Sequence, residues 1–451
     1  MAALSSLLPS RSLKSRNVGY ALFAFFSVAV LLVAGAGPGA DDGAAGPAES
    51  SLHHSQFWIY TGVLLADKER CFNNLIISPF SILGMFRTLE MAAGGETLEQ
   101  MRGFFNEETQ RLTPPPLVPP AVFHFAERVY LNSNPQDHQL TEYKHRIAKV
   151  GGEVKALDFP DPEAARQDIN AFVSEKTEGL IKELVSPGDL DSLPNFLAVN
   201  AAIFKAQWLD HFNTVFESVF FGIGPDHQRV EQRATFMQQT FRIDEIQYTH
   251  IEGRGTIIRL PFTDRKLGMY VMISDNYEEI ATDLTAIHHR LDLLVGASMN
   301  GSSDQPDREV IVTIPKFNIT PDSCKIDVIP AMEAVGITRL NLVPDFSRMT
   351  DRFDNLQLDM WIHKAGIEAD ENGVVATAAS AGSIALISAS LDEPIDLRLD
   401  RPFFFAVIYQ PNIDSANPSD DAVLLFNGHL VNAEAAQVGL EPAGTLEVVH
   451  D

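Results

Sequence analysis

Cysteine is scarce in this sequence, with only Cys71 and Cys324 among 451 residues. Folds that depend on disulfide bonds carry many more cysteines, so one pair cannot be the framework of a protein of this length. We therefore predict that both are buried free thiols, while their redox state stays open. Stability must come from a hydrophobic core instead, and a chain that is 45% hydrophobic can bury a large one.

Basic residues are outnumbered in the chain. It has 34 Lys and Arg against 60 Asp and Glu, which leaves a net charge of -26 at pH 7. Such a chain repels the phosphate backbone of nucleic acids and the surface of anionic lipids, so it gains no counterion-release energy from either. We do not expect nucleic acid as a partner.

The common enzyme signatures are also missing. The sequence contains no Gly-x-Ser-x-Gly elbow, no Gly-x-x-x-x-Gly-Lys phosphate loop, no His-Glu-x-x-His and no Cys-x-x-Cys. The stretch Glu368 to Gly373 resembles the start of a calcium loop, but Ala379 stands where that loop needs a bidentate carboxylate. The adjacent pairs His53-His54 and His288-His289 would diverge on a helix instead of converging on a metal ion. We predict no metal site and no cofactor.

The first 36 residues have the layout of a signal peptide. Basic residues precede an apolar run from Val18 to Ala36, and the last three residues of that run are small. We predict that residues 1–36 direct the protein into the secretory pathway and are removed, which makes the mature protein extracellular. An uncleaved anchor that holds the protein to a membrane through residues 18–36 stays open, because the run approaches spanning length. Residues 37–50 form a linker rich in Gly, Ala and Asp.

The rest of the chain reads as one domain from residue 51 to residue 433. No internal repeat and no Gly/Ser-rich linker divides it. An acidic tail follows over residues 434–451, which we expect to be solvated, and its role stays open. Asn300 and Asn318 begin glycosylation sequons, and the sequence leaves open whether either carries a glycan.

Hydrophobic patterns predict a mixture of helices and strands. Helical spacing appears from His53 to Lys68, after the helix start Ser78-Pro79, and from Pro162 to Thr177. A nearly uninterrupted apolar run from Phe196 to Phe204 is typical of a strand that is covered on both faces. Shorter strands rich in β-branched or aromatic residues are predicted at 256–261, 269–273, 309–314, 397–399, 403–409 and 423–426. The fold class is therefore α+β, with at least one large sheet.

One segment has a composition that suits two different structures. Residues 373–390 carry no charge and are almost entirely small, although polar residues bound the segment on both sides as they would bound an exposed loop. If the segment formed a strand, both of its faces could be buried, because no charged group would lose its hydration. Such a segment is typical of a conformational switch. A flexible Ala/Ser linker and an ordinary core strand are the alternatives that the segment alone leaves open.

Eight motifs in the surrounding sequence then decide the matter: Asn74-Leu-Ile-Ile-Ser-Pro-Phe-Ser81, Gly95-Glu-Thr-Leu-Glu-Gln100, Leu197-Ala-Val-Asn-Ala-Ala-Ile-Phe-Lys205 with Trp208, Ile314-Pro-Lys-Phe317, His363-Lys364, Glu371-Asn-Gly373, Arg401-Pro-Phe403 and Leu425-Phe-Asn-Gly428. In content and order they resemble the motifs of the serpin family, and the resemblance covers nearly all of the predicted domain. It implies a helix-rich N-terminal part, three β-sheets, and a large central sheet that can accept a reactive-centre loop as an extra strand. That loop corresponds to about residues 371–394.

The resemblance also assigns roles to individual residues. It places a hydrogen-bonded cluster beneath the central sheet, called the shutter, and a tryptophan, Trp208, at the breach where the loop begins to insert. The hinge of the loop includes Asn372, which replaces a common acidic residue, and Val374, which replaces a common Thr. A catalytic Ser/His pair is the competing interpretation of Ser78 and His363. The shutter residues are Ser78, Ser81, Asn200 and His363, and the hinge residues are Glu371, Gly373, Val374, Ala376 and Ala378.

The function implied by the resemblance is inhibition of a serine protease by a monomer that is not itself an enzyme. Counting from both ends of the loop puts the scissile bond between Ile387 and Ser388, with Leu386 as the second choice. The protease would cleave this bond and stay covalently attached while the loop inserts. A hydrophobic residue there suits elastase-like, chymotrypsin-like or subtilisin-like enzymes. The physiological target and the source organism stay open.

Two further expectations concern partners and the competing function. We do not expect heparin to activate the protein, because no basic cluster follows Phe104. The alternative function is that of a non-inhibitory serpin acting as a carrier, chaperone or storage protein. No charge or proline lies in the inserting part of the loop, which favours the inhibitor.

Overall fold

The computed structural model describes residues 52–105, 123–132, 138–157, 161–192, 194–251, 255–274, 308–320, 324–350, 356–374, 393–413 and 422–437. The predicted signal segment, the linker, Asn300 and residues 438–451 of the acidic tail lie outside the described residues. The first residues of the predicted tail are not all solvated as expected, because Ala436 is buried and Gln437 Nε2 donates to the carbonyl of Lys316 at 2.8 Å. Among the described residues, none of the helices is long and apolar enough to cross a membrane.

The helices begin where local sequence signals predict them. Ser78 caps α3, its Oγ accepting from the backbone N–H of Ser81 at 3.3 Å, and proline follows at the first helical position. Asp161 caps α6 in the same way and accepts from the N–H of Ala164 at 3.0 Å. The described helices are α2 (Leu52–Ala66), η1 (Lys68–Phe72), α3 (Pro79–Ala92), α4 (Gly95–Phe105), α5 (His138–Ala148), α6 (Pro162–Lys176), α9 (Val328–Ala334) and η3 (Ala435–Gln437).

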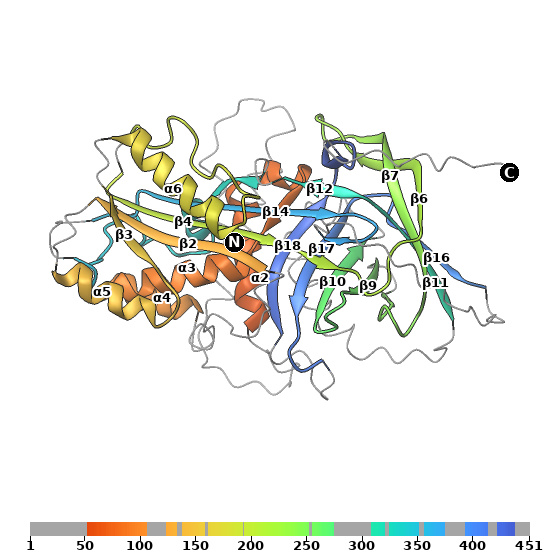
Figure 1. The fold of residues 1–451 in the computed structure, drawn as a ribbon, viewed down its shortest axis with the longest axis horizontal. Helices are drawn as coiled ribbons and strands as arrows, with labels where there is room; N and C mark the ends of the chain where they lie inside the picture. The colour runs from red at the N-terminus through yellow and green to blue at the C-terminus, as the bar shows by residue number, and fades with distance from the viewer. Residues whose placement is uncertain are drawn as a thin grey trace, which may run out of the picture. The chain divides into compact units, whose positions relative to one another are not determined.

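The largest sheet has eight strands and follows the order β3-β2-β4-β14-β15-β5, with β12 and β13 also paired to β14. Strand β4 is antiparallel to β2 and parallel to β14. Figure 1 shows α6 lying along β2 and β4. The strands are β2 (Phe123–Asn132), β3 (Val154–Leu157), β4 (Phe196–Phe204), β5 (Ala206–Gln207), β12 (Phe317–Ile319), β13 (Ile326–Asp327), β14 (Met360–Ala369) and β15 (Gly373–Val374).

Strand β4 is the centre of the core, and all nine of its residues are buried. Alternate residues point to opposite faces of the sheet and join two separate apolar clusters. One face, with Leu197 and Val199, packs in the cluster that contains Ile169 of α6. The other face, with Ala198 and Ala202, belongs to the cluster that contains the buried residues of α3. The apolar run in the sequence is therefore explained by burial on both sides.

Two smaller sheets complete the fold. A six-stranded sheet follows the order β1-β18-β17-β10-β9-β8 and a four-stranded sheet the order β16-β11-β7-β6. Their strands are β1 (Leu75–Ile77), β6 (Thr214–Ile223), β7 (Arg229–Arg242), β8 (Thr249–Ile251), β9 (Gly255–Pro261), β10 (Leu267–Ile273), β11 (Glu309–Pro315), β16 (Ile395–Arg398), β17 (Phe403–Tyr409) and β18 (Val423–Leu430). The predicted α+β class with three sheets is confirmed in the described part of the chain.

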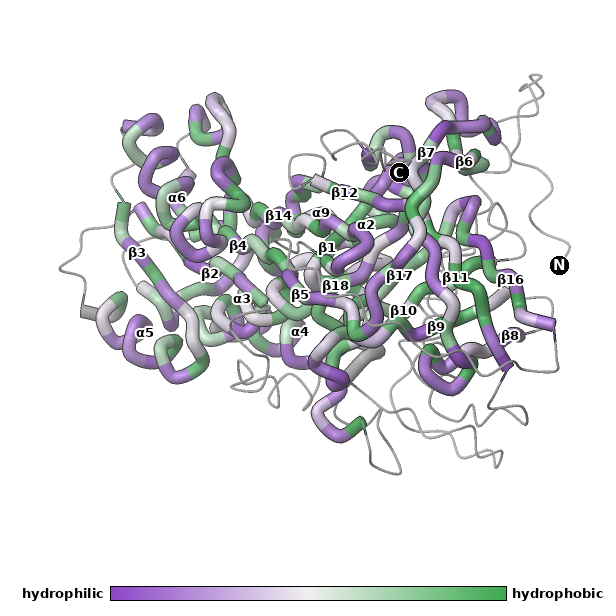
Figure 2. The backbone as a smooth tube through the Cα atoms, turned by 45° about the vertical axis from the view of Figure 1, so that its right-hand side comes forward, coloured by the Kyte–Doolittle hydropathy of each residue, from purple (hydrophilic) through white to green (hydrophobic). Residues whose placement is uncertain are grey.

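Some boundaries differ from the sequence predictions. Strand β16 runs from Ile395 to Arg398, whereas a strand was predicted at 397–399. It therefore begins two residues earlier than predicted and excludes Leu399. The amphipathic helices behave as periodicity requires. In α5 the buried residues Leu140, Tyr143 and Ile147 share one face, and the tube in Figure 2 changes between hydrophobic and hydrophilic colours along this helix.

Candidate functional site

The four predicted shutter residues lie together beneath the central sheet, and each is fully buried. Asn200 of β4 and His363 of β14 are register partners in neighbouring strands, and Asn200 Nδ2 lies 2.9 Å from His363 Nδ1. The N–H of Ser78 donates to His363 Nε2 at 3.1 Å. Asn200 Nδ2 also donates to Ser81 Oγ at 3.1 Å. The first turn of α3 thus connects to both strands.

The local structure explains why serine and histidine meet here. The first N–H groups of a helix have no partner within the helix, and the ring of His363 accepts one of them, that of Ser78. Burial lowers the pKa of His363 to about 3, so its ring stays neutral near pH 7. The indole N–H of Trp361 donates to Asn200 Oδ1 at 3.0 Å and orients that amide.

The geometry argues against a catalytic Ser/His pair. Ser78 Oγ donates to the carbonyl of Leu425 at 2.8 Å, and the contact between Ser78 and His363 is made by the backbone N–H instead of the hydroxyl. Both residues are 0% exposed. A nucleophile needs a base on its own oxygen and access to a substrate, and this serine has neither.

A half-buried carboxyl, which the sequence did not predict, extends the same cluster. Glu127 of β2 is the register partner of Asn200, so Glu127, Asn200 and His363 form a row across three strands. Thr88 Oγ1 donates to Glu127 Oε1 at 2.7 Å, and burial raises the pKa of this carboxyl to about 8. Gly84 of α3 leaves room for it, because a Cβ there would lie 2.5 Å from Glu127 Oε2. Because His124 and Arg128 interrupt the same segment, the sequence pattern does not single out Glu127.

Trp208 lies at the end of the sheet where β14 turns into the loop. Its indole N–H donates to the carbonyl of Asp370 at 2.8 Å, and its backbone N–H donates to the carbonyl of Asn372 at 3.1 Å. Its ring stacks on Phe262 with centroids 4.7 Å apart. Glu371, the first predicted hinge residue, forms an ion pair with Lys316. The turn that leads into the hinge is therefore held from several sides.

The chain reverses over Asp370 to Gly373 and starts a short strand. Asp370 Oδ1 accepts from the N–H groups of Asn372 at 2.7 Å and Gly373 at 2.9 Å, the pattern of an Asx turn. Strand β15 follows and is hydrogen-bonded to β14 on one side and to β5 on the other. At Gly373 a Cβ would lie 2.2 Å from the carbonyl oxygen of Ala206, so only glycine fits this approach. Val374 is fully buried.

Strand β15 separates strands that are direct neighbours farther along the sheet. From Met360 to Gly366, β14 pairs directly with β4. Beyond that point, β15 lies between β14 and β5. The sheet is therefore closed over the predicted shutter residues and already contains Gly373 and Val374 of the predicted loop. The remaining predicted loop residues, Ala376, Ala378, Ile387 and Ser388, lie outside the described residues.

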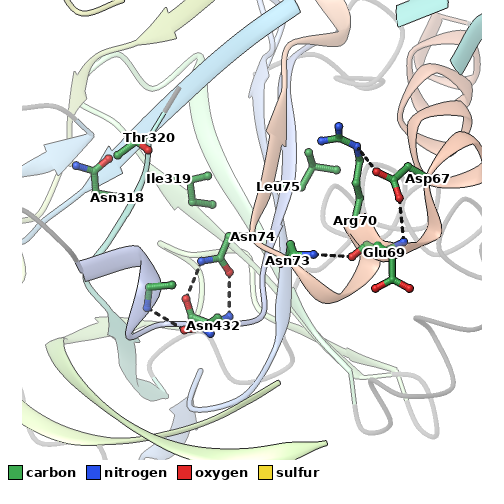
Figure 3. Close-up of a pocket in the computed structure, with 11 residues that line it drawn as sticks. Asp67, Glu69, Arg70, Asn73, Asn74, Leu75, Asn318, Ile319, Thr320 and Asn432 are labelled. Carbon is green, nitrogen blue, oxygen red and sulfur yellow. Dashed lines mark hydrogen bonds and ion pairs between the residues drawn. The ribbon is translucent and has the colours of Figure 1, made fainter. Parts of the chain in front are cut away.

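A polar pocket of about 370 Å³ lies elsewhere, between η1, β12 and the end of β18 (Figure 3). Asn74 closes one wall: its Nδ2 donates to the carbonyl of Asn432 at 2.7 Å, and its Oδ1 accepts from two backbone N–H groups. Asn318 of the sequon, which is partly exposed, lines the same pocket. The pocket shares no residue with the shutter or the hinge. In the described part of the chain, no group of three or more His, Cys, Asp or Glu is placed to hold a metal ion.

The two cysteines lie in the core near this region. Both are buried thiols outside any disulfide bond, as predicted. The N–H of Ile76 donates to Cys324 Sγ at 3.4 Å, and burial raises the pKa of Cys71 to about 12. The raised pKa keeps the Cys71 thiol protonated, which makes it a poor nucleophile.

Comparison with known proteins agrees with this arrangement. Residues 64–433 match the family model described as serpin (serine protease inhibitor). The chain is 28% identical over 368 residues to an uncharacterised serpin-like protein of Pyrobaculum aerophilum, an alignment that covers 80% of this chain and 88% of that one. It is 26% identical over 380 residues to plasminogen activator inhibitor 1 of Bos taurus, covering 78% and 87%. The native structure of tengpin, a thermophilic serpin, matches with a TM-score of 0.69 at 20% identity, covering 87% and 96%. The chain belongs to the serpin family.

Proposed function

We propose that the protein inhibits serine proteases as a single-use trap. The protease serine attacks the carbonyl carbon of Ile387, the peptide bond to Ser388 breaks, and the amine of Ser388 leaves with a proton. The loop from Gly373 to Ile387 then inserts into the central sheet while the acyl-enzyme ester persists. The observation that carries this proposal is β15, a strand of two loop residues already paired between β14 and β5.

The registers on the two sides of β15 support insertion of the whole loop. Val374 pairs with Ala369 of β14 in an antiparallel register, and continuing that register would bring Ala378 opposite Ala365. Val374 also pairs with Ala206 of β5, and the same continuation would bring Ala378 opposite Ala202 of β4. Ala365 and Ala202 are themselves register partners in the closed sheet. The loop could therefore enter without either strand sliding along the other.

The side chains along this path also suit insertion. Continuing the register puts Ser380 between Asn200 and His363, where its hydroxyl can replace the contact that the two residues make in the closed sheet. Gly382 would lie between Trp361 and Ala198, so a glycine of the loop would meet the large side chain of the tryptophan. No charged residue enters, and the desolvation cost of insertion is small.

The length of the loop gives the reach and the driving force. Fourteen residues separate Gly373 from Ile387, and at about 3.3 Å per residue they span about 45 Å. Full insertion would carry the tethered protease from the breach to the opposite end of the sheet. About a dozen new ladder hydrogen bonds contribute on the order of 6 to 18 kcal/mol, comparable with the stability of a whole domain. This energy is available to distort the active site of the protease before the ester hydrolyses.

The residue at the cleavage point suggests the class of target. A hydrophobic primary pocket, as in elastase-like, chymotrypsin-like or subtilisin-like enzymes, accepts Ile387. A pocket with a buried acid, as in trypsin-like enzymes, would leave that acid unpaired against an aliphatic side chain. The monomeric state and the independence from heparin belong to the same proposal.

The proposal is tested by mixing the purified protein with elastase, chymotrypsin, subtilisin and trypsin. Denaturing gels should show a covalent complex with at least one of the first three enzymes. Mass spectrometry should find a released peptide that begins at Ser388. Cleavage near Ile387 with every enzyme but no complex with any would contradict the trap and favour the non-inhibitory alternative.

We further propose that the protein is secreted, on the evidence of the sequence pattern in residues 1–36. N-terminal sequencing of the protein purified from its natural source decides between removal of this segment and an anchor formed by residues 18–36. A mature chain that begins soon after Ala36 supports secretion. A chain that retains residues 18–36 supports the anchor.

A further inference from the structure

The turn at Leu342 and Val343 is the most exposed apolar part of the described chain. Leu342 is 57% exposed and Val343 71%, whereas the next most exposed large hydrophobic residue, Leu180, reaches 39%. Val343 also has a φ of +53°, the left-handed region that β-branched residues avoid. We call these two residues the apolar tip. A strained and exposed apolar turn carries a cost that needs an explanation.

The surroundings hold the apolar tip rigidly. On its C-terminal side, the N–H of Gly94 donates to the carbonyl of Asp345 at 2.8 Å, and the N–H of Asp345 donates to Thr97 Oγ1 at 2.9 Å. On its N-terminal side, Gln100 Oε1 accepts from the N–H groups of Thr338 at 3.1 Å and Arg339 at 2.8 Å. Both sides of the turn are thus fastened to α4 or to Gly94, the residue just before it. Rigid presentation of apolar side chains lowers the entropy cost of binding a partner.

The position of the tip in the fold indicates which partner can reach it. The N–H of Leu358, just before β14, donates to the carbonyl of Leu340 at 3.3 Å. This is the end of the central sheet opposite to the breach. Continuing the antiparallel register of β15 brings Ile387 opposite Leu356. After insertion, Ile387 would therefore lie beside Leu356, two residues before Leu358. Because Leu358 contacts Leu340, this places Ile387 near the apolar tip, which begins two residues after Leu340.

We propose that the apolar tip is a contact surface for the protease that is acylated to Ile387 after the loop has inserted. The inference rests on the proposed function. An enzyme held by an ester at Ile387 would lie beside the surface around Leu356 and Leu340, because the tether keeps it at this end of the sheet. Before insertion the scissile bond lies about 45 Å away along the path of the loop. The tip therefore acts on the trapped complex alone and not on the first encounter.

Photo-crosslinking tests this contact directly. A benzoylphenylalanine residue is introduced at position 343 in one variant and at position 180 in a matched control. Leu180 is also exposed, but it lies at the breach end, where neighbouring Glu178 pairs with Lys205 beyond the end of β4. Each variant is mixed with the protease that forms the covalent complex and with the same protease lacking its catalytic serine.

We expect irradiation to attach the active protease at position 343 and not at position 180. We expect no attachment at position 343 for the inactive protease, because it stays at the uncleaved loop. A covalent complex without cross-linking at position 343 overturns the contact and leaves the proposed function intact. The absence of a covalent complex with the unmodified protein overturns both.

Kinetics give a second measurement. The double substitution Leu342→Asp and Val343→Asp should leave the rate of complex formation unchanged, and the control Leu180→Asp should behave like the unmodified protein. The tip variant should release active protease about tenfold faster, equivalent to about 1.4 kcal/mol of lost contact energy. Equal release rates for the tip variant and the control contradict the proposal.

Discussion

Glu127 of β2 lies directly across from Asn200 of β4, so a half-buried carboxyl adjoins the amide that contacts His363. Thr88 is the hydrogen-bond donor to this carboxyl. Among the charged groups nearby, Glu153 raises its pKa further, while the side chain of Arg128 pairs with Glu153. The carboxyl is therefore neutral over part of the physiological range, and its ionisation places a charge beneath the central sheet.

The first prediction is a pH-dependent stability that depends on Glu127. Its pKa is raised to about 8 in the folded protein, from about 4.3 in an unfolded chain. The folded state therefore binds more protons between these values, and stability falls as pH rises from about 4.3 to about 8, by at most about 1.4 kcal/mol per unit. Below this window the stabilisation is fully present.

Denaturant midpoints of the unmodified protein and of Glu127→Gln, measured from pH 5 to pH 9, check this dependence. The variant has no titrating group here, so its advantage over the unmodified protein should grow with pH and level off above about pH 8. All other groups titrate alike in the two proteins, so their contributions cancel when the two midpoints are subtracted. Parallel midpoint curves would show that this carboxyl is ionised in both states.

The second prediction concerns the space that Gly84 leaves for Glu127. Alanine at position 84 should destabilise the protein, because its Cβ would lie 2.5 Å from Glu127 Oε2. In a Glu127→Ala background the same change should be neutral or stabilising, since alanine is better than glycine inside a helix by about 0.5 to 1 kcal/mol. A double-mutant cycle by chemical denaturation measures the coupling, and additive effects would place the two side chains apart.

The third prediction concerns the hinge. Val374 is buried between β14 and β5, and Val374→Arg would force a charge into that position. We expect cleavage at Ile387 to continue while covalent complexes largely disappear, because insertion cannot start. The conservative change Val374→Thr serves as the control and should preserve the complexes. Gel densitometry of complex and cleaved inhibitor gives the ratio, and unchanged partition in the Arg variant would argue against insertion through β15.

The fourth prediction identifies the residue at the cleavage point. Ile387→Arg should lower the rate of complex formation with an elastase-like enzyme by at least about a hundredfold and create activity against trypsin, because a pocket with a buried acid gains a charged partner. The control is Leu386→Arg, which should change the trypsin rate much less. If the control gains trypsin activity and Ile387→Arg does not, the scissile bond follows Leu386.

Features that depend on neighbouring residues in the sequence were predictable. The helix start at Ser78-Pro79 follows from capping, and the buried strand from Phe196 to Phe204 follows from its continuous apolar run. Strand β14 was not predicted, because His363 and Lys364 interrupt its hydrophobic pattern. Both are buried, and Lys364 Nζ donates to the carbonyl of Glu183, a partner far away in the chain. A buried polar residue is acceptable only where such a partner exists.

The sequence by itself determined the fold class, the family resemblance, the residues of the shutter and the small, uncharged loop, because composition and motif order are properties of the chain alone. Only the tertiary structure decided that Glu127 completes the row with Asn200 and His363, and that β15 holds the loop in register with both neighbouring strands. Asn200 and His363 are 163 residues apart in the chain. Register and the pairing of buried polar groups arise from such distant contacts, which no local pattern encodes.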